Sequence, residues 1–245
     1  MKKIVVLLAF FTCLASIAVA QEEKEIRFGF HLSPTFNWMS ANTNDINPSG
    51  TNLGLRLGMI GEYYFRENYA ITTGIGFIFN HGGTLQHENS GRYWTRTDLP
   101  IPDGTDMPDG VSLDYGIQYL EIPLGLKMRT REFGYIRYYA EPSVILGIKT
   151  QARGKVEQFS QIDSEEQFNI RDEVNLLNMS WGIGGGVEYS ISENTRLIGG
   201  LALHFGFLDV TDDNGQVNDP DRPDPVEEDS KGITRSLTIR IGIMF

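Results

Sequence analysis

Apolar and polar residues alternate with a period of two along most of the chain. Residues 233–245 show this most clearly, with Leu237, Ile239 and Ile241 on one face and Thr238 and Arg240 on the other. Such a period indicates a β-strand with one apolar face. The alternation predicts eight strands, at residues 28–38, 53–64, 69–80, 119–129, 136–149, 177–189, 196–207 and 233–245.

The connections between these strands alternate in length. Three are short, around residues 66–68, 130–134 and 190–194, and four are long, at residues 41–50, 84–115, 152–172 and 209–232. Short turns at one end and long loops at the other are typical of an outer-membrane barrel. The pattern therefore predicts an all-β fold: an eight-stranded antiparallel transmembrane β-barrel with short periplasmic turns and long extracellular loops.

The first twenty residues have the composition of a secretory signal peptide. Lys2 and Lys3 precede an apolar run, and Ala18-Val19-Ala20 forms a small-x-small cleavage site. The run is shorter than the roughly 20 residues that a spanning helix needs. We predict cleavage after Ala20, leaving residues 21–245 as one barrel domain in the outer membrane. The single cysteine, Cys13, lies in the leader, which excludes a disulfide scaffold.

A soluble, lipocalin-like barrel is the alternative fold, and it would enclose a hydrophobic ligand with its apolar faces. The membrane barrel is favoured because the apolar faces are long and carry one clear charge, Arg235, near a strand end. The chain also ends on an aromatic residue, Phe245. A terminal aromatic strand is the feature that barrel-assembly machinery binds, so we expect this machinery as a partner.

Charge is concentrated in the long connections. The chain has a net charge of −11, which becomes −13 without Lys2 and Lys3, and this excess of carboxylates argues against nucleic-acid binding. Residues 209–232 alone hold nine carboxylates against two cations. We therefore expect acidic loops outside the cell, with outer-membrane lipid, lipopolysaccharide and a protein as partners. Aromatic girdles are predicted from Tyr63, Tyr64, Tyr69, Tyr135, Tyr138, Tyr139 and Tyr189 at the turn end and from Trp38, Phe79, Phe205 and Phe207 at the loop end.

The polar strand faces carry many charges, and these would point into a narrow lumen. Eight strands leave an interior just wide enough for side chains, and buried charges must be paired or hydrated. We predict a plug of salt bridges, with His31 and His204 as further members, rather than an ion path. The charged members are Arg56, Glu62, Glu121, Lys127, Arg129, Arg137, Glu141, Lys149, Glu188, Arg196 and Arg240.

Candidate chemistry is sparse outside the lumen. His81, His87, Glu88 and Ser90 lie near the outer end of the third strand, where a rim-site enzyme would act on lipid or peptide. Nothing in the spacing fixes their geometry, so we predict no enzyme, no catalytic residue and no cofactor.

The acidic connection near residue 215 offers oxygen ligands for a divalent cation such as calcium. Its prolines favour a solvated loop instead, so the sequence favours a solvated loop over divalent-cation binding. The candidate ligands are Asp212, Asp213, Asn214, Asp219 and Asp221.

Residues 119–127 read Tyr-Leu-Glu-Ile-Pro-Leu-Gly-Leu-Lys. This stretch resembles a strand of the PorT-like outer-membrane β-barrel proteins of Bacteroidota. The resemblance implies an integral outer-membrane barrel and a link to protein secretion or to surface binding through the acidic loops. We expect a structural or interaction protein; the rim-site enzyme, a small channel and the lipocalin-like barrel are the alternatives.

Overall fold

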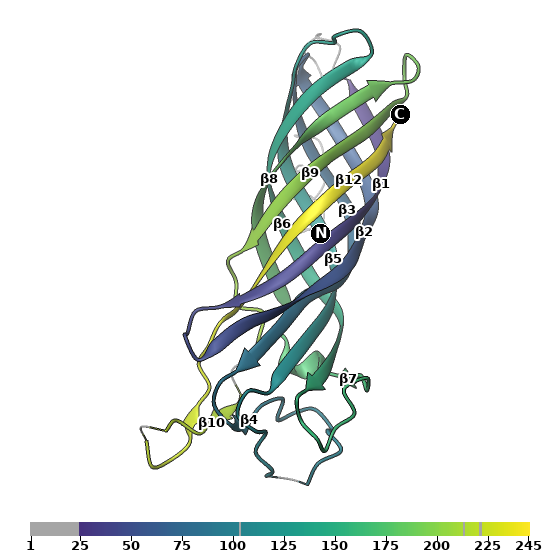
Figure 1. The fold of residues 1–245 in the computed structure, drawn as a ribbon. Helices are drawn as coiled ribbons and strands as arrows, with labels where there is room; N and C mark the ends of the chain where they lie inside the picture. Colours follow the sequence, from purple (N-terminus) through teal and green to yellow (C-terminus); the bar gives the residue numbers. More distant parts are fainter. Residues whose placement is uncertain (1–24, 103, 213, 221) are drawn as a thin grey trace, which may run out of the picture.

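The computed structural model describes residues 25–102, 104–212, 214–220 and 222–245. The predicted signal peptide and its cleavage site lie outside these residues. Within them, eight long strands form the body of the molecule (Figure 1). They are β1 (Ile26–Ala41), β2 (Ile46–Arg66), β3 (Tyr69–His87), β5 (Ser112–Arg129), β6 (Ile136–Glu157), β8 (Leu177–Ser190), β9 (Arg196–Gly206) and β12 (Gly232–Met244).

These strands close into an antiparallel ring. Each pairs with its neighbour in the chain, β5 pairs with β6, and β1 completes the ring by pairing with β12. The backbone of Phe28 exchanges two hydrogen bonds with Phe245, so pairing continues to that residue. The predicted eight-stranded antiparallel barrel is confirmed. The described residues contain no helix long and apolar enough to cross a membrane.

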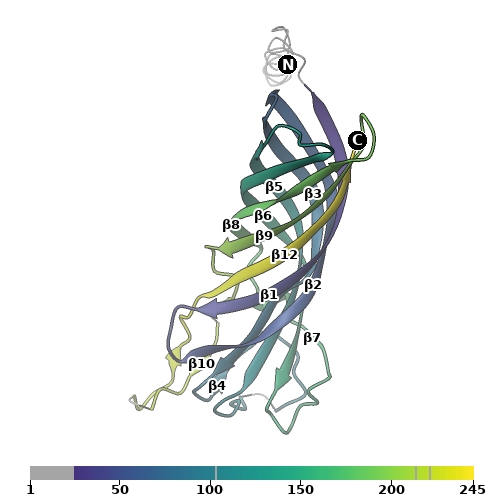
Figure 2. The same ribbon diagram turned by 45° about the horizontal axis from the view of Figure 1, so that its top comes forward.

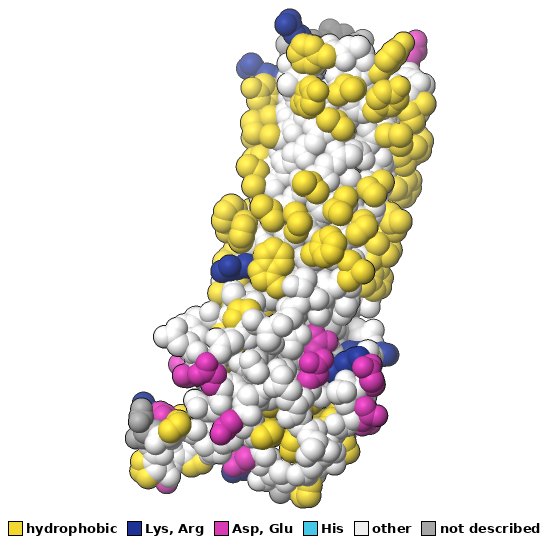
Figure 3. Space-filling model, viewed as in Figure 1, with side chains coloured by type: hydrophobic (Ala, Val, Ile, Leu, Met, Phe, Trp, Pro, Cys, Tyr) yellow, Lys and Arg dark blue, Asp and Glu magenta, His cyan; other side chains and the backbone are white. Residues whose placement is uncertain are grey.

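Large apolar side chains cover the outside of the ring as a band (Figure 3). Leu53 is 65% exposed and Leu124 is 60% exposed, whereas Lys127 on the inner face is 1% exposed. An apolar surface of this extent is rare on soluble monomers and matches a lipid environment. The lipocalin-like alternative is wrong, because the apolar faces point outward and the lumen beneath them is polar.

The short turns and the long connection 209–232 were predicted correctly, but the other three long connections are shorter than predicted. Residues 67–68, 130–135 and 191–195 join strands at the end of the barrel where the C-terminus lies (Figures 1 and 2). At the other end, β2, β3, β5 and β6 continue far beyond the expected strands. The ends of the predicted loops 41–50, 84–115 and 152–172 are therefore strand, because the backbone of these four strands keeps its pairing past the apolar band.

Two bulges lie where the apolar band ends. In β6, Gln151 pairs with Gln118 and Lys149 with Tyr119, which leaves Thr150 as an extra residue. In β3 the register shifts between Ile78 and His81, and Asn80 has a positive φ of 54°. An extra residue in a strand with a period of two exchanges its inner and outer faces.

The exchange is visible in the burial pattern. Along β6 the buried positions are odd-numbered up to Lys149 and even-numbered from Ala152 onward. Along β3 they are even-numbered up to Ile78, and from His81 onward they are odd-numbered apart from Gly82. The bulges therefore turn apolar side chains from the outer face to the inner face at one level of the barrel.

Beyond this level the molecule has an apolar interior, and we call this region the cap. It comprises the described residues of 39–51, 81–118, 151–176 and 207–232. The strand extensions form a curved wall, and the connections fold over it with three short strands in their own sheet, β4 (Gly91–Arg92), β10 (Gln216–Val217) and β11 (Val226–Glu227). A further strand, β7 (Phe168–Asn169), pairs with β6 and precedes a 3₁₀ turn at Arg171–Glu173. The most buried core members are Met39, Met107, Val111, Leu113, Ile117, Ala152, Val156, Ile170 and Val210.

Candidate functional site

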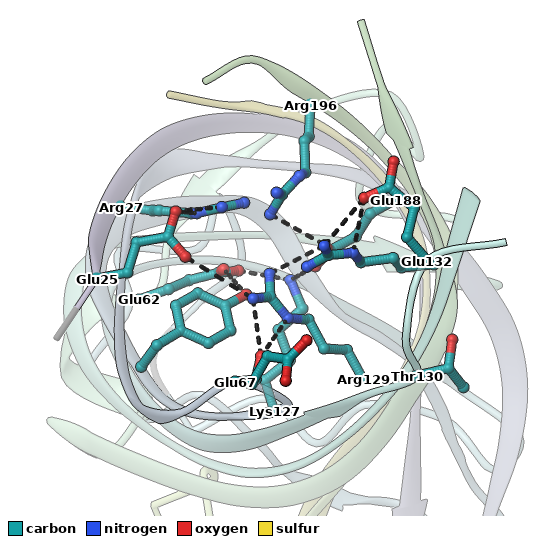
Figure 4. A network of polar contacts seen from close by, with 12 residues as sticks. Glu25, Arg27, Glu62, Glu67, Lys127, Arg129, Thr130, Glu132, Glu188 and Arg196 are labelled. Carbon is teal, nitrogen blue, oxygen red and sulfur yellow. Dashed lines mark hydrogen bonds and ion pairs between the residues drawn. The ribbon is translucent and has the colours of Figure 1, made fainter. Parts of the chain in front are cut away.

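The lumen at the turn end holds a cluster of ion pairs around Lys127 (Figure 4). The Lys127 Nζ lies 2.5 Å from a carboxylate oxygen of Glu62 and 2.5 Å from one of Glu188. All three side chains are at most 3% exposed. The Tyr64 hydroxyl donates to Glu62 at 2.7 Å. The ammonium is therefore neutralised by two carboxylates, as a buried charge requires.

Glu188 joins this cluster to two further cations. Arg129 lies 3.8 Å and Arg196 lies 3.9 Å from its second carboxylate oxygen. The Arg129 guanidinium stacks on the Tyr64 ring at 3.8 Å and donates to the backbone carbonyl of Glu67. Glu188 of β8 thus lies among three cations that come from β5 and β9 (Figure 4).

A second tier lies halfway along the lumen. Arg56 makes a two-pronged contact with Glu121, at 2.7 and 3.1 Å, and donates to the Thr238 hydroxyl at 2.9 Å. Arg240 pairs with Glu141 at 3.0 Å. A cavity of about 70 Å³ lies among these groups.

The lumen is closed toward the cap. Above Arg56, the Nδ1 of His81 lies 3.1 Å from the Asn37 amide oxygen. Beside them, Ile78 and Ile117 are fully buried and Tyr119 is 1% exposed. These three closely buried side chains, two aliphatic and one aromatic with a polar hydroxyl, occupy the lumen between the paired charges and the cap.

The structure places three groups differently from the prediction. Lys149 points inward but lies at the bulge of β6, where it donates to the backbone carbonyls of Arg171 and Val174 instead of joining the lumen pairs. Arg137 lies at the turn end and pairs with Glu132 at 2.9 Å. Arg27, which the prediction missed because its first strand began at Phe28, is buried and pairs with Glu25.

The tyrosine girdle is also smaller than predicted. Tyr69, Tyr135, Tyr138 and Tyr189 are exposed on the outside. Tyr64 and Tyr139 are buried in the lumen, since they lie on the polar face of their strands. At the loop end, Trp181 stacks on Phe205 with ring centroids 5.1 Å apart, and it joins the predicted aromatic residues there.

The sequence matches the family model described as the outer membrane protein beta-barrel domain over residues 19–212. The chain belongs to this family. Its membership and its exposed apolar band place the protein among outer-membrane β-barrels. Comparison with curated proteins gave no match.

Solved outer-membrane barrels resemble the chain at low sequence identity. OprG of Pseudomonas aeruginosa is 11% identical, with 91% of this chain and 97% of that chain covered and a TM-score of 0.44. Ail of Yersinia pestis is 9% identical, with 90% and 99% covered and a TM-score of 0.37. The Escherichia coli outer membrane protease OmpT is 8% identical, with 93% and 99% covered and a TM-score of 0.43. Similarities at this level carry no argument about activity.

The predicted rim residues of this outer-membrane barrel do not assemble into a catalytic group. His81 faces the lumen, whereas His87 is buried in the cap against the Tyr93 ring, with centroids 4.0 Å apart. Glu88 accepts a hydrogen bond from Asn47, and Ser90 accepts one from Asn218. Burial lowers the pKa of His87 to about 4, so this imidazole is neutral at pH 7.

The candidate calcium ligands do not converge either. Asp212 pairs with Arg96 at 2.5 Å, and Asp219 pairs with Arg222 at 3.4 Å. Asp213 and Asp221 lie outside the described residues. Among those that are described, no group of three His, Cys, Asp or Glu side chains is placed to hold a metal ion.

Buried carboxylates instead tie the connections of the cap together. Glu173 accepts hydrogen bonds from the backbone of Arg96, at 2.5 Å, and from the Thr97 hydroxyl, at 3.2 Å. Asp209 likewise accepts from the backbone of Thr211 and Gly232. Burial raises the pKa of Glu173 and of Asp209, and the hydrogen bonds partly offset that rise. These bonds join segments that are far apart in the sequence, so they order the cap.

Proposed function

We propose that the protein is a structural or interaction protein of the outer membrane, whose sealed barrel anchors the cap and whose cap binds a partner outside the cell. The observation that carries this proposal is the exchange of faces at the two bulges. It adds Leu85, Ala152 and Val156 to the apolar core of the cap, over which the connections form an ordered surface.

The lumen supports anchoring rather than transport. Its charges are paired within the lumen, and the buried side chains of Ile78, Ile117 and Tyr119 lie between most of these charges and the cap. A conducting pore needs a continuous file of water, and these buried side chains interrupt it. We therefore expect no stable conductance when the folded protein is inserted into planar bilayers.

The strand that resembles PorT-like proteins also fits a role in the fold. Its odd positions face the lumen: Glu121 pairs with Arg56, Lys127 pairs with Glu62, and Gly125 lies beside Thr72. A Cβ at Gly125 would approach the Thr72 hydroxyl oxygen to 2.5 Å. The resemblance therefore supports the barrel fold most strongly. A PorT-like role as an accessory of protein secretion would use the cap as the surface that docks the partner.

A photo-crosslinking experiment on intact cells tests the proposal. A photoreactive amino acid replaces Asp224, which lies on the exposed connection between β10 and β11, or Glu193, which lies in the turn between β8 and β9. We expect a discrete crosslinked species from Asp224 and a different pattern from Glu193, because the two positions lie at opposite ends of the barrel.

The control is the accessibility of the same two positions to a membrane-impermeant reagent. Reaction at position 224 alone supports the outward cap. Reaction at position 193 alone would overturn the proposed orientation, and steady conductance in bilayers would overturn the anchoring role.

A further inference from the structure

A polar groove runs along the outer wall of β3, β5 and β6, directly beyond the bulges. At this level Gly116 of β5 pairs with Gly82 of β3 on one side and with Arg153 of β6 on the other. Gly116 in this row has no side chain, so the wall is hollowed next to Arg153. Two adjoining cavities of about 390 and 430 Å³ fill the hollow and share Gln151, Arg153 and Gln167 as lining residues.

The lining of the groove has the composition of an anion site. The guanidinium groups of Arg153 and Arg171 are accompanied by side-chain amides, which supply further N–H donors. With its amide oxygen turned toward Arg153, Gln151 accepts from that guanidinium at 2.7 and 3.1 Å and holds it in place. The amide-bearing lining residues are Asn80, Gln118, Gln151, Gln167 and Asn169.

The charges around the groove leave its two arginines available. Lys155 is paired with Glu165 at 2.9 Å, and Asp114 accepts from the Thr84 hydroxyl at 3.3 Å. Neither Arg153 nor Arg171 takes part in a salt bridge among the described residues. Two unpaired guanidinium groups are an exception on a cap whose 209–232 segment is strongly acidic.

The position of the groove at the edge of the apolar band indicates the class of its ligand. The apolar band reaches Phe77 and Phe79 on β3, which stack at 6.2 Å, and the groove begins one residue later at Asn80. In a membrane-spanning barrel this is the level of lipid headgroups. Arginine is the side chain that binds phosphate oxygens with paired N–H donors.

We propose that the groove binds the phosphorylated headgroup of an outer-leaflet lipid, with Arg153 and Arg171 as the phosphate ligands. This inference rests on the proposed function for its outward orientation. It assigns the protein a lipid-binding site on its outer wall, apart from the acidic surface of the cap.

The test is a titration of the purified, folded protein in neutral detergent with bisphosphorylated lipid A, with bound lipid counted by native mass spectrometry. We expect the double variant Arg153→Gln/Arg171→Gln to bind at least tenfold more weakly than the parent chain. The matched control is Arg222→Gln, because this arginine is 64% exposed on the β10–β11 connection and should leave binding unchanged. Lipid A without phosphates should bind the parent chain as weakly as the phosphorylated lipid binds the double variant.

Three results would overturn the groove as a lipid-phosphate site. These are equal binding by the parent and the double variant, equal binding of the dephosphorylated lipid, and binding of inorganic phosphate as tight as that of lipid A. The first two would mean that the acyl chains bind the apolar band, and the third would mean that the ligand is a soluble phosphate.

The orientation is tested separately by labelling Gln167→Cys on intact cells with an impermeant maleimide. Absent labelling would contradict the proposed function and the outer-leaflet source of the lipid. Normal labelling with lost lipid selectivity would overturn the groove alone.

Discussion

The barrel and the cap share four strands, yet they are built with opposite polarity. Inside the apolar band the lumen is held by buried ion pairs such as Lys127–Glu62 and Arg56–Glu121. In the cap the bulged strands turn Leu85, Ala152 and Val156 inward, where they join an apolar core. The solvent decides this difference, because lipid covers the outside of the barrel whereas water surrounds the cap. One chain satisfies both solvents by inserting a bulge residue in β3 and in β6 at the boundary.

The largest expected effect follows from removing the bulge in β6. Deletion of Thr150 places Ala152, Gly154 and Val156 on the outer face and Arg153 on the inner face. We expect the cap to lose its core entirely and to become sensitive to protease, while the barrel keeps its heat-modifiable mobility on gels.

The control deletion is Ser164, which lies in an exposed connection of the cap. It should leave protease resistance intact. Equal sensitivity of the two deletions would show that the register of β6 does not determine the cap.

The next effect concerns the barrel. Glu188→Gln keeps the shape of the side chain but removes the charge that faces Lys127, Arg129 and Arg196. Breaking a buried ion pair from one side costs about 3–5 kcal/mol. We expect a loss of this order in the free energy of unfolding, measured by urea titration of the folded protein in lipid vesicles. Glu193→Gln, in an exposed turn, is the matched control, and an equal loss in both variants would contradict the role of the lumen cluster.

A core truncation in the cap should act on the cap alone. Ile170 is fully buried, and its Cδ1 packs against the backbone of Gly154. Ile170→Ala should cost about 2–4 kcal/mol through lost burial and a cavity. Hydrogen exchange should accelerate in the cap and stay unchanged in the band. Faster exchange throughout the barrel would show that the two regions unfold as one.

The smallest expected effect is a pH dependence of the cap. The pKa of His87 is lowered from 6.5 to about 4 by burial, so the folded state binds fewer protons than the unfolded state between these values. The stabilisation that neutral His87 gives the folded cap is fully present above pH 6.5. It is lost as the pH falls toward 4, by up to about 1.4 kcal/mol per pH unit.

The raised pKa values of Glu173, Asp209 and Glu228 act in the opposite direction. The measurement is therefore the difference between the parent chain and His87→Gln in cap hydrogen exchange. This difference should change between pH 6.5 and 4. A constant difference would contradict a buried neutral imidazole.

The sequence predicts the barrel well because, in a spanning strand, a period of two with one apolar face assigns the apolar side chains to the lipid and the others to the lumen. It also predicts the lumen pairs, since Arg56, Glu62, Glu121 and Lys127 share the polar face. The cap could not be predicted in the same way, because Asn80 and Thr150 carry no sign of a bulge. The alternating Leu113, Tyr115 and Ile117 were a usable signal, but they fell inside a predicted loop.

The site residues that were misplaced have a similar cause. Lys149 points inward as predicted, but the sequence does not give its position along the barrel axis. Its contact with the 3₁₀ turn at Arg171–Glu173 was therefore missed. The groove depends on the pairing of Gly116 with Arg153, and no local sequence pattern reveals this long-range register.

The most direct test of the exchange of faces is cysteine reactivity along β6. The single native cysteine, Cys13, lies in the predicted leader, so one engineered cysteine at a time reports its own position in the mature chain. In the folded protein, a hydrophilic maleimide should label Arg153→Cys and should leave Ala152→Cys and Val156→Cys unlabelled until the protein is denatured. Labelling of Ala152→Cys with protection of Arg153→Cys would mean that the alternation continues unbroken from the membrane, and it would contradict the account.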